Sequence, residues 1–250
     1  MRIIVTTSLG QNPLLVQEAH ALAQHYALTY LERQKQSLKK LTQGETPALV
    51  VYQDKLVLTH PDGSQLYFHP DTAVLRIKAD RDPLVDLLPS DSETVLDTTM
   101  GLASDSIVMA AAGHQITALE VNPLIHLIVS RGLKTFKTGN GQIDKAMRSI
   151  KALNQEALAY MRQLPNKSVD TVYTDPMFSH RITESSNLRG LAPLADFRGL
   201  SESFMQEAQR VARHAIIAKA HFRDDSLERF GFERQIRPNQ KFHYGIKFLL

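Results

Sequence analysis

The chain has 250 residues, of which 43% are hydrophobic, and its formal net charge is +3. This length allows one full-sized α/β domain beside a smaller one, and the hydrophobic fraction excludes a mainly disordered chain. The absence of cysteine excludes disulfides, thiolate zinc sites and cysteine nucleophiles, and no run approaches the roughly 20 apolar residues of a membrane span, so we expect a cytoplasmic protein.

The first part of the chain mixes short strands with helical segments. An amphipathic helix is predicted from Pro13 onward and a short basic helix at residues 37–41. Strands are predicted at residues 3–7, 27–31, 48–52, 55–59 and 65–69. The pattern indicates a small α+β domain over residues 1–80, a candidate for substrate binding, with a linker at residues 80–83.

From residue 84 strands and helices alternate, as expected for a mostly parallel sheet built from βαβ units. Strands are predicted at residues 94–96, 116–119, 150–153, 169–174 and 214–220, with an antiparallel closing pair at 232–236 and 244–249. We therefore predict a Rossmann-like α/β domain over residues 81–250 with a mostly parallel, seven-stranded sheet.

Basic residues gather in two parts of the chain. The first group consists of Arg33, Lys35, Lys39 and Lys40, and the second of Arg181, Arg189, Arg198, Arg210 and Arg213. Binding to a polyanion and an ordinary solvated helix face explain each group equally well.

A loop of small residues follows the predicted strand at 94–96. A ligand can approach its backbone closely, and the helix that follows supplies N–H donors, so Asp97, Thr98 and Gly101 are candidate cofactor contacts. An ordinary βα turn is an equal alternative for this loop alone. Glu120 ends the next strand, 23 residues after Asp97, where a carboxylate can accept both hydroxyls of a ribose. The combination favours a nucleotide-type cofactor and leaves NAD and S-adenosylmethionine open.

Two polar residues follow the third strand of this domain. Asn154 and Glu156 are suited to hold an adenine edge, or they cap the next helix.

A loop with the sequence Asp175-Pro176-Met177-Phe178 follows the predicted strand at 169–174. Ligands of open α/β sheets bind at this carboxyl edge. For methyl transfer to a ring-conjugated amine, Asp175 and the Pro176 carbonyl can accept the N–H hydrogens while Phe178 stacks on the ring. A strand-ending turn with a buried phenylalanine is the alternative.

Other polar residues give weaker indications. His180 and Arg181 are candidates to contact a phosphate, and Lys219, which ends the fifth strand, is a candidate substrate contact. The ten histidines form no metal-binding pattern, so we expect no catalytic metal.

Taken together, these motifs resemble the class I S-adenosylmethionine-dependent methyltransferases, and more closely the bacterial 16S ribosomal RNA guanine-N2 methyltransferases with their uncharacterised Gram-positive relatives. The family loop is approximately Asp-x-Thr-x-Gly-Leu-Gly-x-Asp, which residues 97–105 match except that Ala103 replaces a glycine and adds only a methyl group. The resemblance covers most of the chain, and Asp-Pro-Met-Phe is its most specific motif. It implies cofactor contacts by Ser104, Asp105, Glu120, Val121, Glu156, Ala157 and Asp175.

We therefore expect a methyltransferase that uses S-adenosylmethionine and acts on a guanine amine, with ribosomal RNA or the small ribosomal subunit as partner. Residues 179–181, Ser-His-Arg, depart from the proline- and lysine-rich family sequence, in the loop expected to meet the substrate. An O-methyltransferase acting on a protein carboxylate or small molecule therefore stays open. So does a non-catalytic RNA-binding module.

Overall fold

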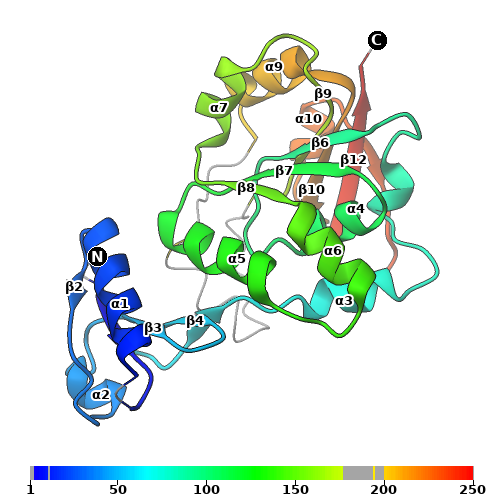
Figure 1. Ribbon diagram of the computed structural model, residues 1–250. Coiled ribbons are helices and arrows are strands. Elements are labelled where there is room, and N and C mark those ends of the chain that lie inside the picture. The colour runs from blue at the N-terminus through cyan, green and yellow to red at the C-terminus, as the bar shows by residue number, and fades with distance from the viewer. Residues whose placement is uncertain (1–2, 11, 177–193, 195–199, 250) are drawn as a thin grey trace. The chain divides into compact units, whose positions relative to one another are not determined.

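The structure, a computed structural model, describes residues 3–10, 12–176, 194 and 200–249 (Figure 1). These residues divide into two compact units, the first extending to His69 and the second beginning at Pro70. No helix in the described ranges has the length and apolar character needed to cross a membrane.

The first unit is built on a five-stranded sheet in the order β2-β1-β3-β4-β5. Its strands are β1 (Ile4–Thr7), β2 (Thr29–Tyr30), β3 (Ala48–Val51), β4 (Leu56–Thr59) and β5 (Gln65–Tyr67), and its helices are α1 (Pro13–His25) and α2 (Leu38–Leu41). Strand β1 pairs in parallel with β2 and β3, whereas β3, β4 and β5 pair antiparallel. This arrangement agrees with the predicted small α+β domain.

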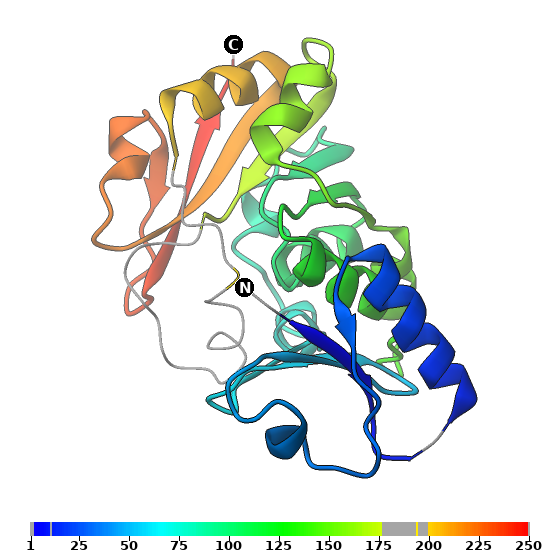
Figure 2. The same cartoon turned by 90° about the vertical axis from the view of Figure 1, so that its left-hand side faces the viewer.

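Local sequence explains where helix α1 begins. Asn12 accepts a hydrogen bond from the Leu14 N–H, and Pro13 occupies the first helical position, where its missing N–H costs nothing. The helix buries Leu15, Ala19 and Ala23 at helical spacing, and Figure 2 shows it beside the sheet of its own unit.

The second unit holds a seven-stranded sheet in the order β11-β12-β10-β9-β6-β7-β8. The strands are β6 (Thr94–Asp97), β7 (Gln115–Leu119), β8 (Lys151–Leu153), β9 (Val169–Thr174), β10 (Ala212–His221), β11 (Glu233–Gln235) and β12 (Phe242–Phe248). Strand β12 pairs antiparallel with β10 and β11, whereas the other neighbouring pairs of this sheet are parallel. The predicted Rossmann-like sheet and its antiparallel closing pair are confirmed.

Helices connect the strands of this sheet. They are α3 (Asp71–Ile77), the 3-10 helix η1 (Val85–Leu87), α4 (Ser104–Ala111), α5 (Pro123–Thr135), α6 (Gly141–Ser149), α7 (Ala157–Gln163), α9 (Glu202–Val211) and α10 (Ser226–Arg229). Helix α3 packs against α4, so its residues belong to the second unit, although we had predicted the first domain to extend to residue 80.

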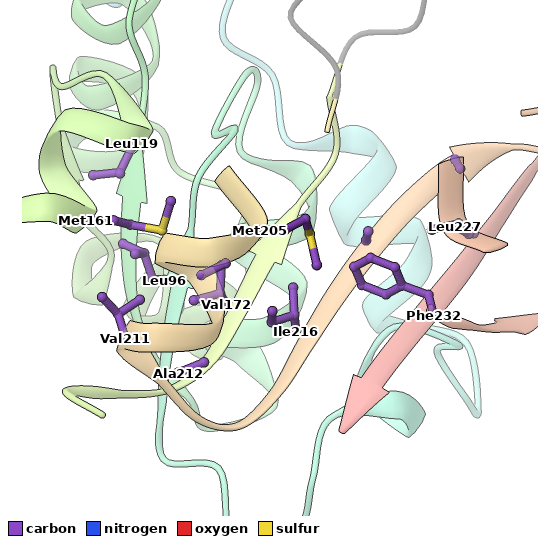
Figure 3. Packing of buried hydrophobic residues seen from close by; sticks show 13 residues of the cluster. Leu96, Leu119, Met161, Val172, Met205, Val211, Ala212, Ile216, Leu227 and Phe232 are labelled. Atoms are coloured by element: carbon purple, nitrogen blue, oxygen red, sulfur yellow. The ribbon is translucent and has the colours of Figure 1, made fainter. Parts of the chain in front are cut away.

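An apolar cluster, shown in Figure 3, joins the centre of the sheet to two helices. Leu96, Val172 and Ile216 are buried on the adjacent strands β6, β9 and β10, and Met161 of α7 and Met205 of α9 belong to the same cluster. Because side chains alternate along a strand, residues next to these in sequence, such as Asp97 and Tyr173, point to the opposite face. The core therefore fixes the strands whose carboxyl ends carry the polar residues described below.

Candidate functional site

Four strands of the second unit end in polar residues at one edge of the sheet. Asp97 ends β6, Glu120 follows β7, Asp175 follows β9, and Lys219 lies near the end of β10. The register pairs Asp97 with Tyr173 and Ala218 with Thr174, which brings the ends of β6, β9 and β10 level. This is the edge at which ligands of open α/β sheets bind.

Hydrogen bonds connect the loop after β6 to both neighbouring strands, β9 and β7. The Thr98 N–H and hydroxyl both donate to the Tyr173 carbonyl, at 2.9 and 3.0 Å, and the Met100 N–H donates to the Leu119 carbonyl at 2.8 Å. Gly101 has a φ of +49°, and a Cβ placed there would approach only the Thr99 carbonyl, at 3.9 Å. The space next to this backbone is therefore open to a ligand.

Ala103 occupies the last position of the loop in a left-handed conformation, with a φ of +62°. A side chain in this region clashes with its own backbone at a cost of roughly 1–2 kcal/mol, which glycine avoids. The methyl group that distinguishes Ala103 from the glycine of the resembling family therefore strains the backbone, which we had not expected from its small size.

The Asp97 carboxylate is turned into this loop. It accepts hydrogen bonds from the Thr99 N–H at 2.9 Å and from the Ser106 hydroxyl at 2.5 Å, and it is almost completely buried. Burial raises the pKa of Asp97 to about 7, although both hydrogen bonds favour the ionised form. Asp97 therefore shapes the loop, and its contact with a cofactor stays a prediction.

Glu120 connects the loops after β6 and β7. Its carboxylate accepts hydrogen bonds from the Gly101 N–H at 3.2 Å and the Asn122 N–H at 2.8 Å. The Asn154 amide donates to the carbonyls of Glu120 and Val121, at 2.7 and 3.1 Å. Asn154 thus holds the end of β7 in place, and the neighbouring Val121 side chain is 39% exposed.

Glu156 is the N-cap of α7, where its carboxylate accepts a hydrogen bond from the Ala159 N–H at 2.6 Å. This is one of the two roles that the sequence left open for it. Ala157 is the first residue of the helix and is half-buried.

Asp175 is held from two sides. Its N–H donates to the Thr99 hydroxyl at 2.6 Å, and its Oδ2 accepts a hydrogen bond from Lys219 Nζ at 2.7 Å. Lys219 Nζ also lies 3.4 Å from Asp105 Oδ2, which in turn accepts the Tyr173 hydroxyl at 2.8 Å. The loop that carries Asp175 is thereby linked to helix α4.

An arginine that the sequence did not indicate completes this network. Arg76 of α3 forms an ion pair with Asp105 and a bidentate pair with Asp82, at 2.8 and 3.0 Å. Its guanidinium also lies 3.5 Å from the hydroxyl of the buried Tyr244. Arg76 is 29 residues from Asp105 in sequence and belongs to none of the motifs that predict the cofactor site, so only the packing of α3 on α4 reveals the pair.

The pKa values of the two central acids of this network, Asp105 and Asp175, are shifted in opposite directions. Burial alone would raise the pKa of Asp105, but the charges of Lys219 and Arg76 lower it to about 2. Burial raises the pKa of Asp175 above its ordinary value even though Lys219 opposes that shift. The charges of Lys219 and Arg76 therefore favour the ionised form of Asp105, whereas burial disfavours the ionised form of Asp175.

Three predicted substrate contacts, Phe178, His180 and Arg181, lie outside the described residues, as does Met177. Within the described part of the chain no group of three or more histidine or acidic side chains could hold a metal ion. Ser104 begins helix α4 next to Asp105, and its contact with a cofactor stays a prediction.

Comparison with known proteins adds independent information. A family model described as "Putative SAM-dependent methyltransferase", in which SAM denotes S-adenosylmethionine, matches residues 34–237. The uncharacterised protein YpiP of Bacillus subtilis is 33% identical over 97% of this chain and 98% of its own length. A SAM-dependent methyltransferase structure from Neisseria gonorrhoeae, 17% identical, superposes with a TM-score of 0.64 over 98% of this chain and 95% of that one, which shows a shared fold.

Proteins named ribosomal RNA small subunit methyltransferase J also match. The protein from Marinobacter nauticus is 38% identical over 35% of this chain and 31% of its own length. The protein from Hydrogenovibrio crunogenus is 26% identical over 65% of this chain and 61% of its own length. The matched segments thus span about a third to three fifths of these relatives.

Proposed function

The chain belongs to the family of putative SAM-dependent methyltransferases, and from this premise we propose that it transfers a methyl group to the exocyclic amine of guanine in ribosomal RNA. The cofactor is S-adenosylmethionine. The observation that carries the proposal is the position of Asp175, whose backbone N–H donates to Thr99 and whose carboxylate accepts from Lys219, beside the loop that Glu120 supports.

The residues at the ends of β6 and β7 fit this cofactor. A carboxylate oxygen can accept more than one hydrogen bond, so Glu120 can take the ribose hydroxyls while it holds the loop. The open space next to Gly101 and the exposed Val121 suit the close approach of a nucleoside. The Asp105 carboxylate already accepts from Arg76, Lys219 and Tyr173, two of them cations, so we assign the backbone N–H groups at the start of α4, not that carboxylate, to the cofactor.

The complete set of proposed cofactor contacts follows the sequence prediction. It comprises Asp97, Thr98, Gly101, Ser104, Asp105 through its backbone N–H, Glu120, Val121, Asn154, Glu156, Ala157 and Asp175.

The residues of the chain contribute by positioning the acceptor amine and by accepting its hydrogen bonds. When bound, the cofactor supplies an electrophilic methyl group. Lys219 binds Asp175 Oδ2, so we assign Oδ1 and the Pro176 carbonyl to the N–H hydrogens of the acceptor amine, which turns nitrogen electron density toward the methyl group. Stacking by Phe178, and phosphate contacts by His180 and Arg181, complete the proposed substrate site.

Two observations support ribosomal RNA as the acceptor. The Asp-Pro-Met-Phe loop suits an amine on a flat ring, and relatives named ribosomal RNA small subunit methyltransferase J share 26–38% identity over parts of this chain. An acceptor of this kind would place the enzyme in the cytoplasm.

A direct test supplies full-length protein and methyl-labelled S-adenosylmethionine with small ribosomal subunits, isolated ribosomal RNA and a panel of proteins and small molecules. The expected product is N2-methylguanosine in the RNA, identified by nucleoside mass spectrometry. Label on a carboxylate or on a small molecule would replace the proposal with an O-methyltransferase, and no transfer to any acceptor despite cofactor binding would favour a non-catalytic module.

A further inference from the structure

The first unit also contains three parallel strands whose carboxyl ends lie at one edge of its sheet. Strands β2, β1 and β3 are adjacent and parallel, and the chain leaves β1 toward β2 before it crosses to β3 on the other side. In open α/β sheets such a reversal of strand order creates a crevice at the carboxyl ends, where ligands bind. At these ends lie Thr7, the last residue of β1, and Ser8 after it, together with Arg33 after β2 and Tyr52 after β3.

Arg33 is a buried cation at this edge. Its side chain donates to the carbonyls of Thr7 at 3.2 Å and Gln36 at 2.7 Å, and the residue is only 8% exposed. Within the described chain no carboxylate forms an ion pair with it, and burial lowers the pKa of Arg33. A cation that is removed from water without a counter-charge is costly, and an anionic ligand would remove that cost.

The guanidinium retains donors for such a ligand. The two carbonyls take the single Nε–H and one N–H of Nη1. Three of the five N–H donors therefore remain, one on Nη1 and two on Nη2. Nη2 has no hydrogen-bond partner in the described chain. It is not one of the fully buried side-chain atoms that lack a partner, so it is accessible to a ligand. Arg33 can therefore present a fork of donors to a tetrahedral anion at the strand ends.

The backbone next to Arg33 is held in an unfavourable conformation. Gln34 and Lys35 have φ values of +44° and +61°, although neither is glycine. This turn brings the Gln36 carbonyl to the Arg33 side chain and so fixes the direction of the guanidinium. Left-handed residues of this type are concentrated at ligand clamps and other functional sites.

The loop after β1 supplies further groups. Ser8 donates its N–H to the Val51 carbonyl at 2.9 Å, which keeps this residue at the same edge of the sheet. Gly10 has a φ of +114°, and a Cβ placed there would meet no atom within 4 Å. Leu9 and Leu14 are 64% and 72% exposed. Apolar side chains at this level of exposure can contact the face of a base or a ribose.

We propose that the carboxyl edge of β1, β2 and β3 binds the phosphate group of a nucleotide, with Arg33 as its cation, Ser8 as an added donor, and Leu9 and Leu14 against the attached nucleoside. A free nucleotide and a nucleotide within an RNA chain present the same phosphate chemistry. These residues belong to the first unit, whereas the methyltransferase site belongs to the second, and the proposal does not depend on the proposed acceptor.

The test uses the full-length protein with S-adenosylhomocysteine present, so that the cofactor site cannot take up the probe. Uridine 5′-monophosphate, a ten-nucleotide oligouridylate and phosphate-free uridine are titrated at constant ionic strength. We expect one or both phosphorylated probes to bind at least tenfold more tightly than uridine. Arg33→Met should abolish that difference, and Arg33→Lys should weaken it because lysine lacks the planar fork.

Two further variants guard against misfolding and non-specific charge effects. Ser8→Asp places a negative charge at the proposed site without removing Arg33 and should weaken phosphate binding at least tenfold. Lys40→Met removes an exposed charge from the same unit and should leave binding unchanged.

Arg33-dependent binding of the mononucleotide identifies a free-nucleotide site, and Arg33-dependent binding of the oligonucleotide alone identifies an RNA-backbone site. The proposal is overturned if neither phosphorylated probe binds better than uridine, or if binding persists in both Arg33→Met and Ser8→Asp. Methyl transfer measured in parallel shows whether the proposed function fails separately.

Discussion

Replacing Lys219 with methionine would test how the ion network supports Asp175. The ammonium lies 2.7 Å from Asp175 and 3.4 Å from Asp105. At an effective dielectric constant of about 20, each ion pair contributes roughly 5–6 kcal/mol of Coulomb energy. Asp175 can take up a proton when its partner is lost, so we expect the free energy of unfolding to fall by less than that sum, by about 3–5 kcal/mol at pH 8.

The loss of stability caused by the same substitution should depend on pH, and the direction of that dependence can be derived. Burial already raises the pKa of Asp175, and removing Lys219 raises it further. A carboxyl whose folded pKa lies above its unfolded value of about 3.9 contributes stability at low pH and loses it as pH rises through the folded pKa. The destabilisation should therefore be larger at pH 8 than at pH 5, and methyl transfer should require a higher pH than in the wild type.

Urea unfolding at pH 5, 6.5 and 8 measures the first effect, and the pH profile of kcat/KM measures the second. Lys219→Arg keeps the charge and should recover most of both, whereas Lys145→Met, at an exposed position on α6, should change neither. A loss of stability that is equal at all three pH values, with an unchanged activity profile, would refute the electrostatic role of Lys219.

Three other substitutions test separate parts of the second unit. Hydrogen bonds from Arg213 and Thr94 outweigh the effect of burial and lower the pKa of Asp170 to about 2. Asp170 should thus contribute roughly 2 kcal/mol to the free energy of unfolding above pH 4, and this contribution should disappear as pH falls toward 2. Urea unfolding of Asp170→Asn should lack this pH dependence. Glu120→Gln should weaken cofactor affinity about 10- to 100-fold in calorimetry, while Glu93→Gln, at the opposite edge of the sheet, should not. Ala103→Gly should change unfolding free energy by less than about 1 kcal/mol, because relief of roughly 1 kcal/mol of strain offsets about 0.8 kcal/mol of lost methyl burial; a loss above 2 kcal/mol would contradict this.

Much of the fold could be predicted because hydrophobic periodicity and turn residues act locally. The strands at 94–97, 115–119 and 169–174 contain β-branched and apolar residues and are followed by polar or turn residues, and Pro13 marks the start of α1. The boundary between the two units was harder to predict. Helix α3 belongs to the second unit only because it packs against α4, and that contact joins residues far apart in sequence.

The site shows the same division between local motifs and tertiary contacts. Asp97, Glu120 and Asp175 could be found from the sequence because each ends a strand, and the ends of parallel strands share one edge. Arg76 could not be found, because its partner Asp105 lies on another helix. Arg33 belonged to a group of basic residues for which a solvated surface was an equal explanation, and only the structure shows that it is buried.

The most direct test of the central claim compares wild-type protein with Asp175→Asn, in which the backbone N–H that binds Thr99 is kept. Binding of S-adenosylmethionine and transfer of its methyl group to guanine in small-subunit ribosomal RNA are measured on the same samples. We predict that the variant stays folded and binds the cofactor, but that its transfer rate falls at least 100-fold. Unchanged transfer by the folded variant would contradict the role assigned to Asp175.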